Sequence, residues 1–141
     1  MKRKFSWSIF WALVAISVVI ASIFAVAANV PAFRELLDGF PFIIISGAAF
    51  FLLGVALIVL TVKERVQGIL KIFLILTGAS AVGLPVFVLL HNVVSGLFNI
   101  EEPVFFIMAV FVCPIGFLVG AVGTIVLAIK SKQVKQSSQN S

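Results

Sequence analysis

The sequence predicts an all-α fold, a polytopic transmembrane four-helix bundle with both termini cytoplasmic. Three observations predict it: the composition, four long apolar runs, and the distribution of charge between those runs. Hydrophobic residues make up 62% of the 141 residues and charged residues only 11%, with a mean hydropathy of +1.29. So little polar surface cannot coat a globule in water, and we expect lipid to surround most of the chain.

The apolar runs predict helices at about 6–30, 41–62, 69–92 and 103–129, within a single transmembrane domain over residues 1–130. Each run reaches the roughly 20 residues that a helix needs to cross a bilayer. The runs are continuous and do not alternate, and a lipid-exposed sheet would have to close into a barrel of many more strands. Helices are therefore expected throughout.

The first run follows Lys2, Arg3 and Lys4 and carries two tryptophans near its start, which suits an interfacial anchor. Its basic start and the small residues 25–28 also resemble a cleavable signal peptide, and cleavage would leave three helices. The run is longer than the 7–15 residues usual for a signal-peptide core, which favours a retained helix.

The gaps between the runs predict alternating sides of the membrane. Residues 31–41 carry Arg34, Glu35 and Asp38 between two prolines and are expected to form a short amphipathic turn. A basic turn around 63–68 precedes the third run, and the gap 95–102 carries two acids and no base. The polar residues 131–141 predict a flexible cytoplasmic tail, because they cannot bury enough apolar surface to fold alone.

Nine of the ten Lys and Arg residues fall on one predicted side, and Arg34 is the exception. Short loops rich in Lys and Arg remain in the cytoplasm, so the pattern predicts a multi-pass cell-membrane protein with cytoplasmic termini. The basic inner rim is interpreted first as a topology determinant and second as a contact for anionic lipid headgroups. No basic and aromatic surface outside the apolar runs indicates nucleic-acid binding.

Small residues recur at helical spacing on one face of three predicted helices. These faces comprise Cys113, Gly116, Gly120, Gly123 and Thr124; Gly47, Gly54 and Thr61; and Ser17, Ala21, Ala25 and Ala28. Lipid tails offer helices no hydrophobic gain on association, so close packing of small side chains predicts where helices meet. We expect contacts within one chain; self-association into a homo-oligomer is the alternative. Cys113 is interpreted as a small packing residue.

The predicted helix 69–92 gathers polar and helix-weakening residues near mid-membrane. Pro85 removes a backbone donor, while Thr77, Ser80 and His91 share one face, which Ser95 would join if the helix continued. One hypothesis is a polar stripe that lines a cavity, as in transporters. The alternative is ordinary packing, since proline is common in membrane helices.

His91 is the only histidine, and Asn92, Glu101 and Glu102 lie close to it in the sequence. A histidine with one or two carboxylates at the outer end of a helix can bind a divalent cation or pass a proton. The alternative is an interfacial histidine that hydrogen-bonds to a loop carbonyl, with the two acids capping the last helix.

The chain contains no motif of a known catalytic, metal or cofactor site, and no acid lies inside an apolar run. We therefore expect no enzyme activity, no metal and no cofactor, and a structural or accessory role beside a larger membrane partner. The alternative function is a small transporter or channel element. Its candidate site comprises His91, Thr77, Ser80, Asn92, Glu101 and Glu102.

Overall fold

The computed structural model describes residues 3–37 and 40–141, and every regular element within them is helical. The elements are α1 Arg3–Asn29, α2 Pro31–Leu37, α3 Phe40–Lys63, α4 Ile69–Phe98, α5 Pro103–Ile107, η1 Met108–Val112 and α6 Cys113–Gln139. Four helical stretches in these residues are long and apolar enough to cross a membrane: Phe5–Asn29, Pro41–Lys63, Ile69–Phe98 and Pro103–Gln139. This agrees with the predicted all-α class and indicates a multi-pass membrane protein.

The helix ends differ from the prediction in three places. The expected turn after the first run contains the helix α2, α4 continues beyond residue 92 to Phe98, and α6 continues beyond residue 129 to Gln139. Residues 131–139 are therefore helical, although their side chains are exposed. A helix that already exists extends without a new nucleus, and Lys and Gln are good helix formers. Lys2 and Asp38, which the sequence places on opposite sides of the membrane, lie outside the described residues.

The fourth long apolar stretch contains a short π-helical segment, η1, just before Pro114. Here the backbone N–H of Cys113 donates to the carbonyl of Met108, five residues earlier. Pro114 has no N–H, and its ring would crowd the carbonyl four residues before it, so a widened turn relieves the local conflict. Helix α4, by contrast, runs unbroken through Pro85.

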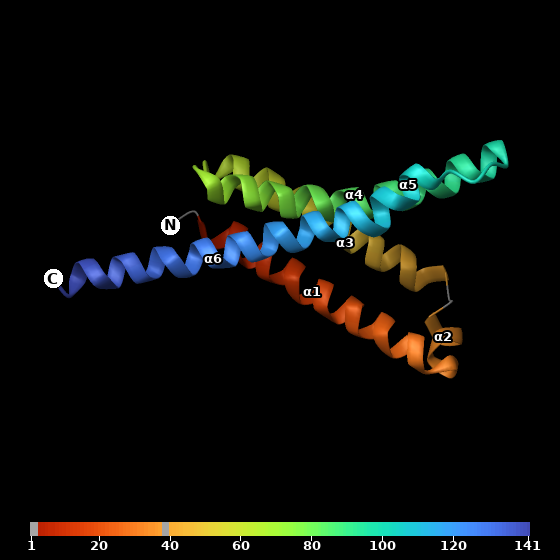
Figure 1. Ribbon diagram of the computed structural model, residues 1–141, viewed down its shortest axis with the longest axis horizontal. Helices are drawn as coiled ribbons and strands as arrows, with labels where there is room; N and C mark the ends of the chain where they lie inside the picture. The colour runs from red at the N-terminus through yellow and green to blue at the C-terminus, as the bar shows by residue number, and fades with distance from the viewer. Residues whose placement is uncertain (1–2, 38–39) are drawn as a thin grey trace.

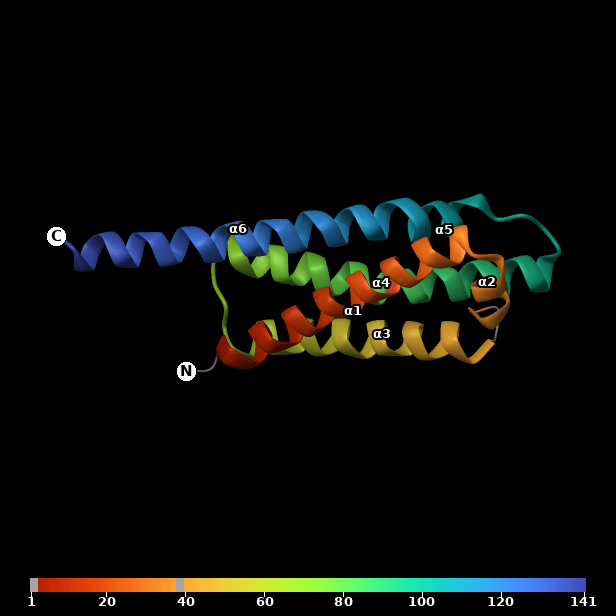
Figure 2. The same cartoon turned by 90° about the horizontal axis from the view of Figure 1, so that it is seen from below.

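Helix α4 is the central element, with α3 on one side and α6 on another (Figures 1 and 2). Helix α1 packs on α3 and crosses the other helices obliquely (Figure 2). The start of α1, the α3–α4 turn and the end of α6 lie at one end of the molecule, whereas α2 and the loop before α5 lie at the other. The fold thus separates the basic segments from Glu35, Glu101 and Glu102.

Helices α3 and α4 meet at two glycines. A Cβ atom placed on Gly54 would lie 2.9 Å from the carbonyl oxygen of Gly78, and one on Gly78 would lie 3.0 Å from the carbonyl of Gly54. Any larger side chain would push the two backbones apart. About two turns earlier in α3, Gly47 faces Pro85, where a built Cβ would lie at an ordinary 3.7 Å from Pro85 Cβ. The predicted small face of this helix is therefore its contact with α4.

Helices α4 and α6 interlock through a second set of glycines. A Cβ atom on Gly116 would lie 2.5 Å from Ser80 Oγ, and one on Gly123 would lie 2.5 Å from the Phe73 ring. At Gly120 the added atom would meet Thr77 and would lie 2.9 Å from the Phe73 carbonyl. The small face predicted for residues 113–124 is confirmed as an intramolecular contact.

Three threonines are completely buried in these contacts, one in each of α3, α4 and α6. Their Oγ1 atoms donate to the carbonyl four residues earlier in the same helix, at 2.6 Å for Thr61 and 2.8 Å for Thr77 and Thr124. Each hydroxyl is satisfied within its own helix, so it can be buried without a partner on the neighbouring helix.

Helix α1 does not pack through the small face predicted for it. Ala21, Ala25 and Ala28 are exposed, whereas Phe10 and Leu13 are fully buried. The large side chains lie near the start of α1, where Phe10 stacks on Trp7 with ring centroids 5.5 Å apart. Helix α1 is therefore held mainly through its first half, by bulky rather than small residues.

A polar contact also fastens the start of α1. Ser6 is 3% exposed, and its Oγ donates to Glu64 Oε2 at 2.6 Å while its backbone N–H donates to Glu64 Oε1 at 3.4 Å. Both hydrogen bonds lie in the first turn of α1. A carboxylate there also favours the positive end of the helix dipole. Glu64, the acid between Lys63 and Arg65, therefore has a structural role in this contact.

We expect Gly120→Ala to lower the free energy of unfolding by about 1–3 kcal/mol, the usual range for overpacking, because the added methyl meets the α4 backbone. Gly96→Ala is the matched control, since a Cβ there meets nothing within 4 Å. Removing a helical glycine in open space should stabilise by up to about 1 kcal/mol. Reversible unfolding in mixed micelles measures both; equal effects would contradict the assigned α4–α6 contact.

Candidate functional site

The polar stripe of α4 divides into two parts. Thr77 and Ser80 lie in the close contact with α6, where Thr77 is 0% and Ser80 9% exposed. Their side chains fill the space between the helices and do not line an opening there. His91 lies farther along α4, beyond the last close contact with a glycine of α6, and is half-buried.

His91 joins the end of α4 to the loop before α5. Its Nδ1 lies 2.9 Å from the carbonyl oxygen of Glu102. A carbonyl only accepts hydrogen bonds, so Nδ1 carries a proton and donates it in this contact. The ring also lies 5.6 Å from that of Phe106, at an angle of 51°. The expected hydrogen bond between an interfacial histidine and a loop carbonyl is therefore present.

A hollow of about 500 Å³ opens beside this histidine. We call it the His91 hollow; its lining residues are His91, Ser95, Glu101, Glu102, Pro103 and Phe106. Among the described residues, two buried side-chain oxygens lack a hydrogen-bond partner, Ser95 Oγ and Glu102 Oε2, and both belong to this lining. Glu101 is exposed at the rim.

The structure thus brings together His91, Glu101 and Glu102, but not all six predicted residues. Asn92 is exposed, and its Nδ2 donates to the carbonyl of Val88 in its own helix. Thr77 lies about four turns from His91 along α4. The predicted site is therefore reduced to the three residues at the end of α4 and in the following loop.

The two acids do not cap the following helix as the alternative interpretation expected. Glu102 occupies the N-cap position of α5, but its side chain makes no capping hydrogen bond. Its backbone is extended, and Pro103 takes the first helical position, where a missing N–H has no consequence. The Glu102 carboxylate is instead turned to the His91 hollow.

Three lining residues were not in the predicted set: Ser95, Pro103 and Phe106. Ser95 joins the face of His91 because α4 continues to Phe98. Phe106 follows Glu102 by four residues, a spacing that places two side chains on one face of a helix, so this signal was present in the sequence. Its orientation toward His91 also depends on η1, because a widened turn shifts the residues before it relative to α6.

The chemistry of the His91 hollow is that of hydrogen-bond acceptors. No group of three or more His, Cys, Asp or Glu side chains in the described residues is arranged to hold a metal ion. No Lys or Arg occurs between Lys71 and Lys130, so the two acids have no basic neighbour in this part of the sequence.

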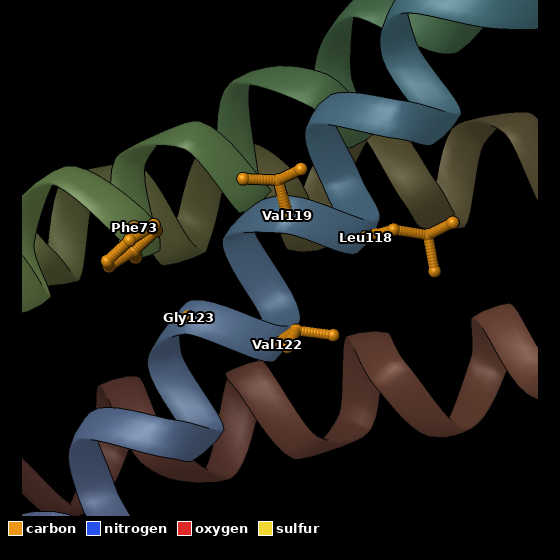
Figure 3. Close-up of a pocket in the computed structure, with 5 residues that line it drawn as sticks. All are labelled: Phe73, Leu118, Val119, Val122 and Gly123. Carbon is orange, nitrogen blue, oxygen red and sulfur yellow. The ribbon is translucent and has the colours of Figure 1, made fainter.

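A second hollow, of about 440 Å³, lies between α4 and α6. Figure 3 shows Leu118, Val119 and Val122 projecting from α6, with Gly123 on the same helix next to Val122 and Phe73 on α4. The lining contains no polar side chain, so it offers no catalytic or ligating group. Cys113 is also unsuited to surface chemistry, because it is 5% exposed and packs beside Gly83.

Comparison of the chain with protein-family models, curated protein sequences and solved structures gives no match.

We expect His91→Phe to weaken the attachment of the loop 99–102 to α4, since it keeps a ring but loses the hydrogen bond to Glu102. A neutral hydrogen bond contributes about 1 kcal/mol, so amide exchange in this loop should accelerate about fivefold. Asn92→Ala is the control, because that amide bonds only to its own helix. Hydrogen–deuterium exchange of the peptide that contains residues 99–102 measures this effect. Unchanged exchange in His91→Phe would contradict a stabilising hydrogen bond between His91 and the Glu102 carbonyl.

Proposed function

We propose that the protein is a non-catalytic structural or accessory subunit of the cell membrane that packs against a larger membrane partner. The observation that carries the proposal is the burial of Thr77 and Ser80 against α6. The most polar stretch inside the bilayer is used to join helices, and the core α3–α4–α6 is closed by glycine contacts. Such a core supports a role based on shape and attachment.

The alternative, a small transporter or channel element, requires polar groups that line a path through the bilayer. Thr77 and Ser80 were the mid-membrane members of that path, and both are enclosed by helix contact. The polar groups that remain open, at the His91 hollow, lie at one end of the molecule. This distribution supports the accessory role over transport.

The proposal includes an orientation with both termini cytoplasmic. The described basic segments at residues 3–4, 63–71 and 130–135 all belong to one end of the fold, and Glu35, Glu101 and Glu102 belong to the other (Figure 2). The positive-inside rule places the basic end in the cytoplasm. Anionic lipid headgroups are the expected contact of that end.

Single cysteines in a Cys113→Ala background test the orientation. We expect a membrane-impermeant thiol reagent, added to intact cells, to label Glu35→Cys and Asn99→Cys. Lys4→Cys, Gln67→Cys and Gln139→Cys should react only after permeabilisation, because these three positions lie at the basic end of the fold and the first two variants at the acidic end. Labelling of Gln67→Cys from outside would reverse the orientation, and loss of the N-terminal residues from the mature mass would show cleavage of α1.

Photo-crosslinking in native membranes tests the accessory role. A crosslinking amino acid at Val18, Leu52 or Leu118 samples three outward faces, since these side chains are 60–66% exposed. We expect one face to give a discrete adduct with another protein, and the other faces to give lipid adducts. Leu57, fully buried, is the control position and should give no intermolecular product. Lipid adducts alone on every face would argue against a partner.

A further inference from the structure

The lining of the His91 hollow contains far more acceptors than donors. Its charged acceptors are the carboxylates of Glu101 and Glu102, the hydroxyl of Ser95 can accept or donate, and the Nδ1 proton of His91 is already used by the Glu102 carbonyl. Among them, Ser95 Oγ and Glu102 Oε2 are buried without a partner. A buried acceptor without a donor is unfavourable, so the lining is suited to a ligand that only donates.

The charge of the lining specifies the ligand further. Two carboxylates lie at the hollow, and the stretch between Lys71 and Lys130 contains no Lys or Arg. The basic residue at this end of the fold is Arg34 on α2, whose side chain is exposed and does not line the hollow. A cation is therefore favoured. The described residues provide no group of three metal ligands, which disfavours a divalent metal ion.

An aromatic ring completes the surface. Phe106 lines the hollow and lies beside the His91 ring, with 5.6 Å between ring centroids. The face of an aromatic ring attracts an organic cation at distances up to about 6 Å. Carboxylates, a hydroxyl and an aromatic ring around one hollow match an alkylammonium group, whose –NH₃⁺ has three donors and no acceptor.

We propose that the His91 hollow binds a primary ammonium group, with Glu101 and Glu102 as counter-charges and Phe106 against its carbon chain. This site is independent of the proposed accessory role, since it rests on the lining alone. Helix α4 has 30 residues, a length of about 45 Å against about 30 Å of hydrocarbon, so the hollow lies near the headgroup layer. Both a free amine and the ethanolamine headgroup of a phospholipid offer this chemistry at that depth.

The single histidine provides a direct reporter. Protein labelled with ¹⁵N-histidine, in phosphatidylcholine nanodiscs, has one imidazole and hence one set of ring signals. We expect ethylammonium to shift these signals saturably, whereas tetramethylammonium, which has no N–H donor, should not do so at the same concentration. Equal responses to the two cations would overturn recognition of the ammonium group by hydrogen bonds. The absence of a saturable response would also overturn it, provided that phosphatidylethanolamine gives no shift either.

Charge-neutral variants test the residues. Glu102→Gln should weaken ethylammonium binding about tenfold or more, because it removes a charged hydrogen-bond partner. Glu35→Gln makes the same change at an exposed acid on α2 and should leave binding unchanged. Glu101→Gln, at the exposed rim, is a second variant that does not disturb a buried group. Binding that is the same in wild type and in both hollow variants would refute the assignment.

Exchanging phosphatidylcholine for phosphatidylethanolamine distinguishes the two sources. A matching shift without added amine, lost in Glu102→Gln, identifies the lipid headgroup as the ligand. A shift with ethylammonium but not with the lipid identifies a soluble amine. Absence of a shift with both would overturn the proposal, and the circular dichroism spectrum of each variant confirms that the helices are intact.

Discussion

The close approach of α4 to both α3 and α6 is the contact on which the rest of the fold depends. In lipid, helices gain little from burying apolar surface, so van der Waals contact between backbones must hold them together. Gly54 and Gly78 provide it on one side of α4, and Gly116 and Gly120 on another. Because both contacts use the same helix, α4 is held firmly along its middle; α3, α5, η1 and α6 pack directly on it, and α1 is attached through α3.

This arrangement decides where polar groups can act. In the middle of α4 the hydroxyls of Thr77 and Ser80 are enclosed by α6, and Thr77 bonds to its own helix. Toward the end of α4 the glycine contacts stop, and the path from α5 to α6 contains the widened turn η1 before Pro114. The unpartnered oxygens of Ser95 and Glu102 occur there, where a ligand has room.

The two ends of the molecule use acids differently. At the basic end, Glu64 accepts two hydrogen bonds from Ser6 and fastens α1 to the α3–α4 turn, so it has a structural role. At the opposite end, Glu101 and Glu102 lie beside His91 without a basic residue in the surrounding sequence. Helix α1, held near its start by Phe10 and Leu13, leaves Ala21, Ala25 and Ala28 in its second half exposed.

Hydropathy alone predicted the helical class and the four long apolar helices, because backbone groups in lipid must be satisfied within a helix. Helical spacing also predicted the small faces of α3 and α6, since residues three and four apart share a side. Which face of α1 packs, how far α4 and α6 extend, and the pairing of Ser6 with Glu64 depend on contacts between distant segments. The same holds for the His91 hollow. The sequence groups His91, Glu101 and Glu102 because they are close along the chain. That Thr77 and Ser80 do not belong to the same site follows only from the position of α6, which encloses them. Periodicity specifies a face of a helix, whereas only the tertiary structure decides what that face meets.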